Sequence, residues 1–177
     1  MKSIITLTLF SLISFSALAQ QVHHENHDQK EEQHQHRGHL EILLGHYMDA
    51  KNALVQDDFE TAKESLKAFA EEVQGSEEMN EHEEHSEKHA DHHANIVAAV
   101  EDASEAENID SLRAAFKNIS YELITAVENQ EYDGTLFKQF CPMFEGGSSW
   151  LSTEKEVQNP FYGQKMHNCG DSAEIIE

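Results

Sequence analysis

Sulfur-bearing side chains stand in two pairs near the end of this chain, and each pair joins a thiol to a thioether. Cys141 and Met143 form the first pair, and Met166 and Cys169 form the second. Thiolates and thioethers are soft ligands, and together they suit Cu(I) better than zinc and far better than magnesium or calcium. We therefore expect these four side chains to form a soft-metal site, with Cu(I) as its first candidate.

The segment that carries these pairs, residues 140–170, also holds both prolines and the only tryptophan. Conformationally special residues at this density predict an irregular loop in place of another helix. Asn159-Pro160 and Gly163 are typical of turns, and we expect them to bring Met166 and Cys169 back toward Cys141. The two cysteine Cα atoms should then lie within about 7 Å. Aromatic side chains are expected to dock the segment onto the rest of the domain: Phe140, Phe144, Trp150, Phe161 and Tyr162.

Histidines form two further groups of candidate ligands. The polar stretch 20–39 contains six of them, lacks an apolar face and is expected to be a disordered leader. Downstream, four histidines recur at one helical face: His82, His85, His89 and His92. Imidazole suits Zn(II) and Cu(II), so these four are a weaker second site. The acidic residues among them favour the alternative of a solvated helical arm.

The first residues have the three parts of a secretory signal. Lys2 precedes an apolar run from Ile4 to Phe15, and Ala17-Leu18-Ala19 supplies a small-x-small cleavage site. The run is too short to span a bilayer comfortably. We expect residues 1–19 to be a signal peptide and the mature chain to be exported, without membrane insertion after cleavage.

Charge and motifs exclude several classes of protein. The chain has 34 acidic and 12 basic side chains, a formal net charge of −22. Nucleic acids and anionic membranes require a basic face, so neither is an expected partner. The sequence has no Cys-x-x-Cys, nucleophile elbow or phosphate-binding loop, so we do not expect an enzyme.

Two cysteines in an exported chain also predict one disulfide, here between Cys141 and Cys169. A disulfide gives the neighbouring methionines no role, although methionine often fills gaps in a core. Both interpretations stay open, because a reduced pair could hold Cu(I) and an oxidised pair could close the same loop.

Apolar residues at spacings of three and four predict the elements that position these groups. Four helices are expected at 40–56, 58–74, 80–104 and 109–130, with Asp57 and Glu60 resembling a cap of the second helix. Short connections favour an antiparallel bundle. The predicted fold is all-α: a single helical domain over 40–177, in which 40–130 form a four-helix bundle and 131–177 an irregular C-terminal loop segment packed on it.

Four short strings carry a resemblance to a known family. They are Cys-Pro-Met from Cys141, Trp-Leu-Ser from Trp150, Asn-Pro-Phe-Tyr-Gly from Asn159 and Met-x-x-Cys-Gly from Met166. Together with the weaker patches 47–58 and 113–120, they resemble a bacterial periplasmic domain family of unknown function. That domain occurs alone or fused to the adaptor proteins of copper/silver efflux pumps. The resemblance implies a periplasmic location, copper as the metal and an efflux adaptor as a partner.

The sequence therefore predicts an exported protein that binds Cu(I) or Ag(I) and acts in metal resistance, buffering or delivery. The alternative is a structural or adaptor module, whose disulfide-stapled C-terminal loop docks on an efflux or envelope partner.

Overall fold

The computed structural model describes residues 25–75, 87–129, 132 and 134–176. The chain divides into two compact units, Met1–Gln35 and His36–Glu177. The first unit contains the beginning of helix α1 (Glu25–Val55), whereas the predicted signal peptide, 1–19, lies outside the described residues. No helix in the described ranges is both long and apolar enough to cross a membrane.

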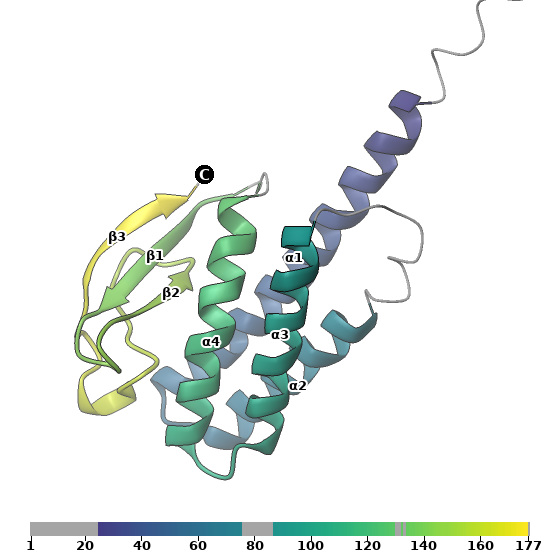
Figure 1. Cartoon of the computed structure of the whole chain (residues 1–177). Coiled ribbons are helices and arrows are strands. Elements are labelled where there is room, and N and C mark those ends of the chain that lie inside the picture. The colour runs from purple at the N-terminus through teal and green to yellow at the C-terminus, as the bar shows by residue number, and fades with distance from the viewer. Residues whose placement is uncertain (1–24, 76–86, 130–131, 133, 177) are drawn as a thin grey trace, which may run out of the picture. The chain divides into compact units, whose positions relative to one another are not determined.

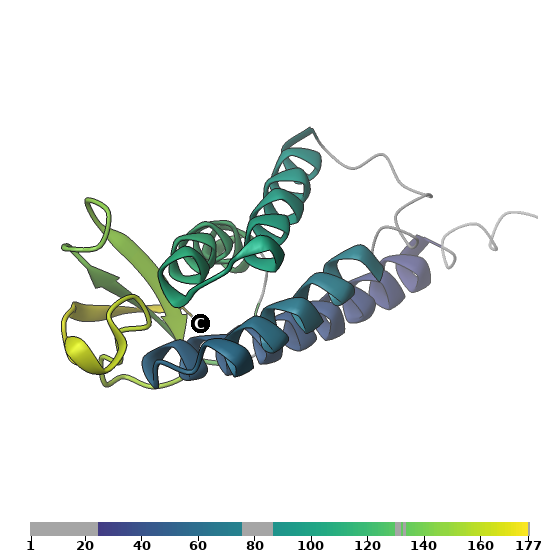
Figure 2. The same ribbon diagram turned by 90° about the horizontal axis from the view of Figure 1, so that it is seen from below.

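Four helices dominate the described chain: α1, α2 (Phe59–Gly75), α3 (Glu87–Glu105) and α4 (Ile109–Glu128) (Figure 1). α1 lies beside α2, as Figure 2 shows, and α3 packs along α4. Their apolar faces meet in one core, where the rings of Tyr47 and Phe116 stack with centroids 4.8 Å apart. The prediction of four helices is confirmed for the described residues.

The beginnings of α2 and α4 are capped by side chains. Asp58 accepts a hydrogen bond from the backbone N–H of Thr61 at 3.1 Å, and Asn108 accepts one from the N–H of Ser111 at 2.9 Å. Each cap satisfies a donor that the first turn of the helix leaves free. The expected cap at Asp57 is therefore wrong by one residue, because the Asp57 carboxylate binds elsewhere.

The first helix begins earlier than predicted. α1 starts at Glu25, so residues that were expected to belong to a disordered leader, 20–39, are helical from that point. Gln, Glu and Lys are good helix formers, and no proline interrupts this stretch. Lacking an apolar stripe, it carried no periodic signal by which the sequence could place the helix start.

The expected all-α class is corrected by a three-stranded antiparallel sheet. Its strands are β1 (Leu136–Cys141), β2 (Ser148–Ser152) and β3 (Asp171–Ile176), in the order β2-β1-β3. Phe140 lies opposite Ser149 in β2 and opposite Asp171 in β3. The predicted irregular segment survives between the strands, where it includes the short helix η2 (Gly163–Lys165).

These strands escaped prediction because they lack the alternation of a half-buried strand. The pairing of β1 with β3 shifts register between Lys138 and Phe140, which breaks the period of two. In β2, the adjacent residues Trp150 and Leu151 point to opposite faces and are both fully buried, so β2 is covered on both faces there. α4 packs against β2, and Trp150 contacts Phe161 from the C-terminal segment. The sheet thus joins the C-terminal segment to the helices.

Candidate functional site

The two cysteines meet at one end of the sheet. Cys141 is the last residue of β1 and is fully buried. The antiparallel pairing of β1 with β3 brings Cys169, which precedes β3, to that end. The thiol of Cys169 is hydrogen-bonded to the thiol of Cys141, and neither takes part in a disulfide. The structure therefore joins two of the four predicted sulfur ligands directly.

Protonation of this pair is set by its surroundings. Burial is the main cause of a raised pKa of the Cys169 thiol. The negative charge of a Cys141 thiolate, the hydrogen bond between the two thiols and the carboxylate of Asp171 raise the pKa further. Repulsion between neighbouring negative charges opposes ionisation of this thiol, and a bound cation would relieve that repulsion.

A single buried side chain, Asn159, holds the turn that carries Cys169. Its Nδ2 donates to the carbonyl of Cys169 at 2.6 Å, and its backbone N–H donates to the carbonyl of His167 at 2.8 Å. The Cys169 N–H donates to the carbonyl of Met166 at 2.9 Å, which closes the turn. Asn159 Oδ1 accepts from the N–H of Phe161 at 2.8 Å. The sequence marked this position as a turn residue, but its Asn-Pro context did not reveal the contact with Cys169.

Hydrogen bonds of Arg113 and Asp57 fix the other side of the C-terminal segment. Arg113, which is only 3% exposed, donates from Nε to the carbonyl of Pro160 at 2.9 Å and from Nη2 to Asp57 Oδ1 at 2.6 Å. Asp57 Oδ2 accepts from the N–H of Gln164 at 3.2 Å. The Arg113 hydrogen bond is the main cause of the lowered pKa of Asp57. Gly163 has a φ of +53°, and a Cβ there would collide with both charged side chains.

Aromatic rings dock the segment as the sequence predicted. Phe161 stacks on Phe144 with centroids 4.6 Å apart and meets the edge of Trp150 at 5.7 Å. Its ring also lies 6.1 Å from that of Phe116 in α4. Phe140 differs from the expectation, because its side chain is 38% exposed. The docking surface is therefore built around Phe161.

The two methionines occupy different environments. Met166 is half-buried and begins the same turn that ends at Cys169. Met143 is 60% exposed, and its carbonyl accepts a hydrogen bond from the hydroxyl of Tyr162 at 3.2 Å. Met166 thus lies partly buried in the turn that ends at Cys169, whereas Met143 lies at the surface two residues beyond Cys141.

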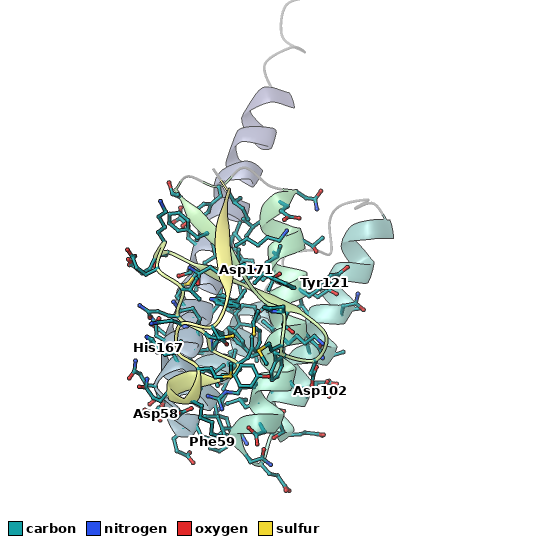
Figure 3. The ribbon with its side chains drawn as sticks, turned by 90° about the vertical axis from the view of Figure 1, so that its left-hand side faces the viewer. Asp58, Phe59, Asp102, Tyr121, His167 and Asp171 are labelled. Carbon is teal, nitrogen blue, oxygen red and sulfur yellow. The ribbon has the colours of Figure 1, made fainter. Side chains whose placement is uncertain are left out.

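Two of the four histidines in the predicted second site lie outside the described residues. His82 and His85 lie beyond the described residues, whereas His89 and His92 belong to α3. Within the described ranges, no three His, Cys, Asp or Glu side chains are arranged to hold a metal ion. His167 therefore does not complete a three-ligand group with the two cysteines, although its Nδ1 is buried without a hydrogen-bond partner. Figure 3 labels His167 and Asp171, which flank Cys169 in the chain.

Comparison with known proteins finds one family. Residues 43–134, slightly more than half of the chain, match the model of a protein family of unknown function, DUF3347. The match covers most of the helical core and ends before the sheet, so the cysteine-containing strings lie beyond it. Neither the curated proteins nor the solved structures contain a significant match.

Proposed function

The chain belongs to the DUF3347 family of proteins of unknown function, and we propose that it is an exported protein that binds a soft monovalent ion, Cu(I) or Ag(I). Copper resistance, buffering or delivery is the activity that such binding would serve. An efflux adaptor is the proposed protein partner.

The observation that carries this proposal is the contact between the thiols of Cys141 and Cys169. Two adjacent thiolates form a soft, anionic ligand pair, which favours Cu(I) and Ag(I) over hard cations. Cation binding would displace the protons of the thiols and offset the repulsion between the sulfurs. Met166 in the same turn as Cys169 supplies a third soft donor to the region.

The remaining thioether supports a route by which the ion reaches the pair. Met143 is exposed and follows the buried Cys141 by two residues, so an incoming ion would meet its sulfur first. The formal charge of −22 raises the concentration of cations around the protein. Met143 is therefore proposed as the entry ligand and the two cysteines as the final ligands.

Titration of the fully reduced protein with Ag(I), in the presence of Zn(II), tests this function. Wild type should bind one Ag(I), and Zn(II) should not displace it. Met143→Leu and Met166→Leu should weaken the binding, whereas Met48→Leu, a methionine of α1 packed against the core, should not. A double Cys141→Ala, Cys169→Ala variant that still binds one Ag(I) would place the site elsewhere.

The histidines are proposed as a separate, weaker site for Zn(II) or Cu(II). Binding should occur at neutral pH and be lost near about pH 5, as the imidazoles protonate. A variant lacking residues 20–39, with His82, His85, His89 and His92 changed to Asn, should lose it. If that variant binds as wild type does, the histidines have no part in metal binding.

A structural or adaptor role is the alternative function. Two apolar side chains of the C-terminal segment are exposed, Phe140 at 38% and Met143 at 60%, and such residues are typical of contact surfaces. The Ag(I) titration of the methionine variants separates the two functions, because loss of the Met143 and Met166 thioethers should weaken soft-metal binding but should leave the disulfide of an adaptor intact.

A further inference from the structure

We propose that Cys141 and Cys169 also form a redox pair, whose oxidation to an intramolecular disulfide closes the soft-metal site. Formation of the disulfide is inferred from the contact between the two thiols and from the position of Cys169 just before β3. Its consequence, the loss of metal binding, rests on the proposed function.

The geometry requires little movement of the backbone. The thiols are already in contact, and hydrogen bonds through Asn159 hold the turn that carries Cys169. Cys169 precedes β3, so its backbone is not one of the paired positions of the sheet. Disulfides form where two cysteines can approach without distorting the chain, and the hydrogen bond between the two thiols already holds this pair side by side.

The two thiols are not equivalent toward a reagent in solution. Cys141 is fully buried at the end of β1, opposite Ser148 of β2, whereas Cys169 is only partly buried. A small disulfide molecule therefore has better access to Cys169 than to Cys141. This difference assigns the attacking thiol to Cys169 and the resolving thiol to Cys141.

The exchange has two steps. Cys169, as a thiolate, attacks one sulfur of a low-molecular-weight disulfide, forms a mixed disulfide and releases one small thiolate. The Cys141 thiolate then attacks the Cys169 sulfur, forms the protein disulfide and releases the second small thiolate. The two protons lost by the cysteines end on the two released thiols, so the protein is oxidised by two electrons and the reagent is reduced by two.

Oxidation and metal binding exclude each other in this arrangement. Both thiolates that would hold the ion are consumed in the sulfur–sulfur bond, so the oxidised protein lacks the anionic ligands. Reduction restores them. The pair would thereby make metal binding depend on the redox state of the compartment.

Oxidised glutathione serves as the probe, with free thiols and protein mass as the measurements. Wild type should lose both free thiols without retaining glutathione. Cys141→Ala should trap one glutathione on Cys169, because nothing resolves the mixed disulfide. Cys169→Ala should stay unmodified while folded, since Cys141 is buried. The only tryptophan, Trp150, lies against Gly170 beside the pair, so its fluorescence reports whether each variant is folded.

The outcomes separate this inference from the proposed function. Wild type that keeps both thiols, or that stops at the mixed disulfide, overturns the redox pair even if the reduced protein binds Ag(I). An oxidised protein that still binds Ag(I) overturns the closing of the site. A disulfide that forms as described in a protein whose reduced state binds no Ag(I) instead overturns the metal function and leaves the redox pair standing.

Discussion

Arg113 of α4 and Asp57, in the turn after α1, form an ion pair with Nη2 and Oδ1 2.6 Å apart. The guanidinium also donates to the carbonyls of Leu54 and Pro160, and the carboxylate accepts from the N–H of Gln164. The pair therefore joins the end of α1 to the C-terminal segment. Asp57 holds its carboxylate there with a φ of +61°, a conformation that costs energy outside glycine.

Arg113→Met should destabilise the protein by about 1–3 kcal/mol, because it removes the described donor to the buried Pro160 carbonyl, one of two donors to the Leu54 carbonyl and the ion pair with Asp57. Chemical denaturation at neutral pH measures the loss. Lys117→Met is the matched control on the same helix, since it removes a more exposed ion pair with Glu145 and should cost less than about 1 kcal/mol. Equal losses of unfolding free energy in the two variants would contradict the importance of the Arg113 hydrogen bonds.

The same variant should show a pH dependence. Hydrogen bonding to Arg113 lowers the pKa of Asp57, so its stabilisation is present above the ordinary carboxyl pKa of 3.8 and is lost as the pH falls through the lowered pKa. The stability difference between wild type and Arg113→Met should narrow in strong acid. A constant difference would assign the whole effect to the two carbonyls.

Asn159→Ala should weaken both the fold and the metal site. It removes the donor to Cys169 and the acceptor for Phe161, which should cost about 1–3 kcal/mol in unfolding free energy. Without the hydrogen bonds of the Asn159 side chain, the turn no longer holds Cys169 against Cys141, so Ag(I) affinity should fall as well. Asn168→Ala, an exposed position in the same turn, should leave both quantities unchanged. Unchanged Ag(I) affinity in Asn159→Ala would show that the Asn159 side chain does not position the Cys169 thiol.

Phe116→Ala should cost about 3–5 kcal/mol, because the ring is fully buried between Tyr47 and Phe161 and its removal leaves a cavity. Tyr121→Ala is the control on the same helix. Its side chain is 68% exposed, and the change should stay within about 0.5 kcal/mol. Urea denaturation followed by Trp150 fluorescence measures both, and similar midpoints would be incompatible with this core.

Lys51→Met should make the protein more stable at neutral pH. Lys51 is 1% exposed, its one described hydrogen bond reaches Ser152 at 3.4 Å, and burial lowers its pKa from 10.5. The folded state therefore disfavours the protonated amine. The free-energy cost of burying that charge grows as the pH falls from 10.5 through the lowered pKa. The gain in unfolding free energy should shrink at alkaline pH. Lys67 is exposed, so Lys67→Met should show no such dependence on pH. A gain independent of pH would reflect packing alone.

The helices were readable from the sequence because their signal is local. Residues such as Leu112, Phe116 and Ile119 repeat at spacings of three and four, and the stripe that they form needs only one helical turn of context. Asn108 likewise caps α4 through a residue three positions away. Contacts of this range are encoded within a short window, so the number of helices and most of their ends followed from residue types.

The sulfur site was only partly readable. Residue types alone identified Cys141 and Cys169, and the turn residues between them predicted that the chain would return. The thiol contact itself depends on the pairing of β1 with β3, whose strands are separated by a long loop and interrupted by a register shift. Nothing in a local window encodes that pairing.

The positions that hold the site in place were decided by the tertiary structure. Asn159 looks like any turn residue, and Asp57 looks like a helix cap, until distant segments supply their partners. Each side chain can satisfy several acceptors or donors, and local sequence does not choose among them. Packing makes that choice. Buried Arg113 binds the carboxylate of Asp57, so Asp58 caps α2 instead. The same ion pair helps to fix the segment that carries Cys169 to Cys141.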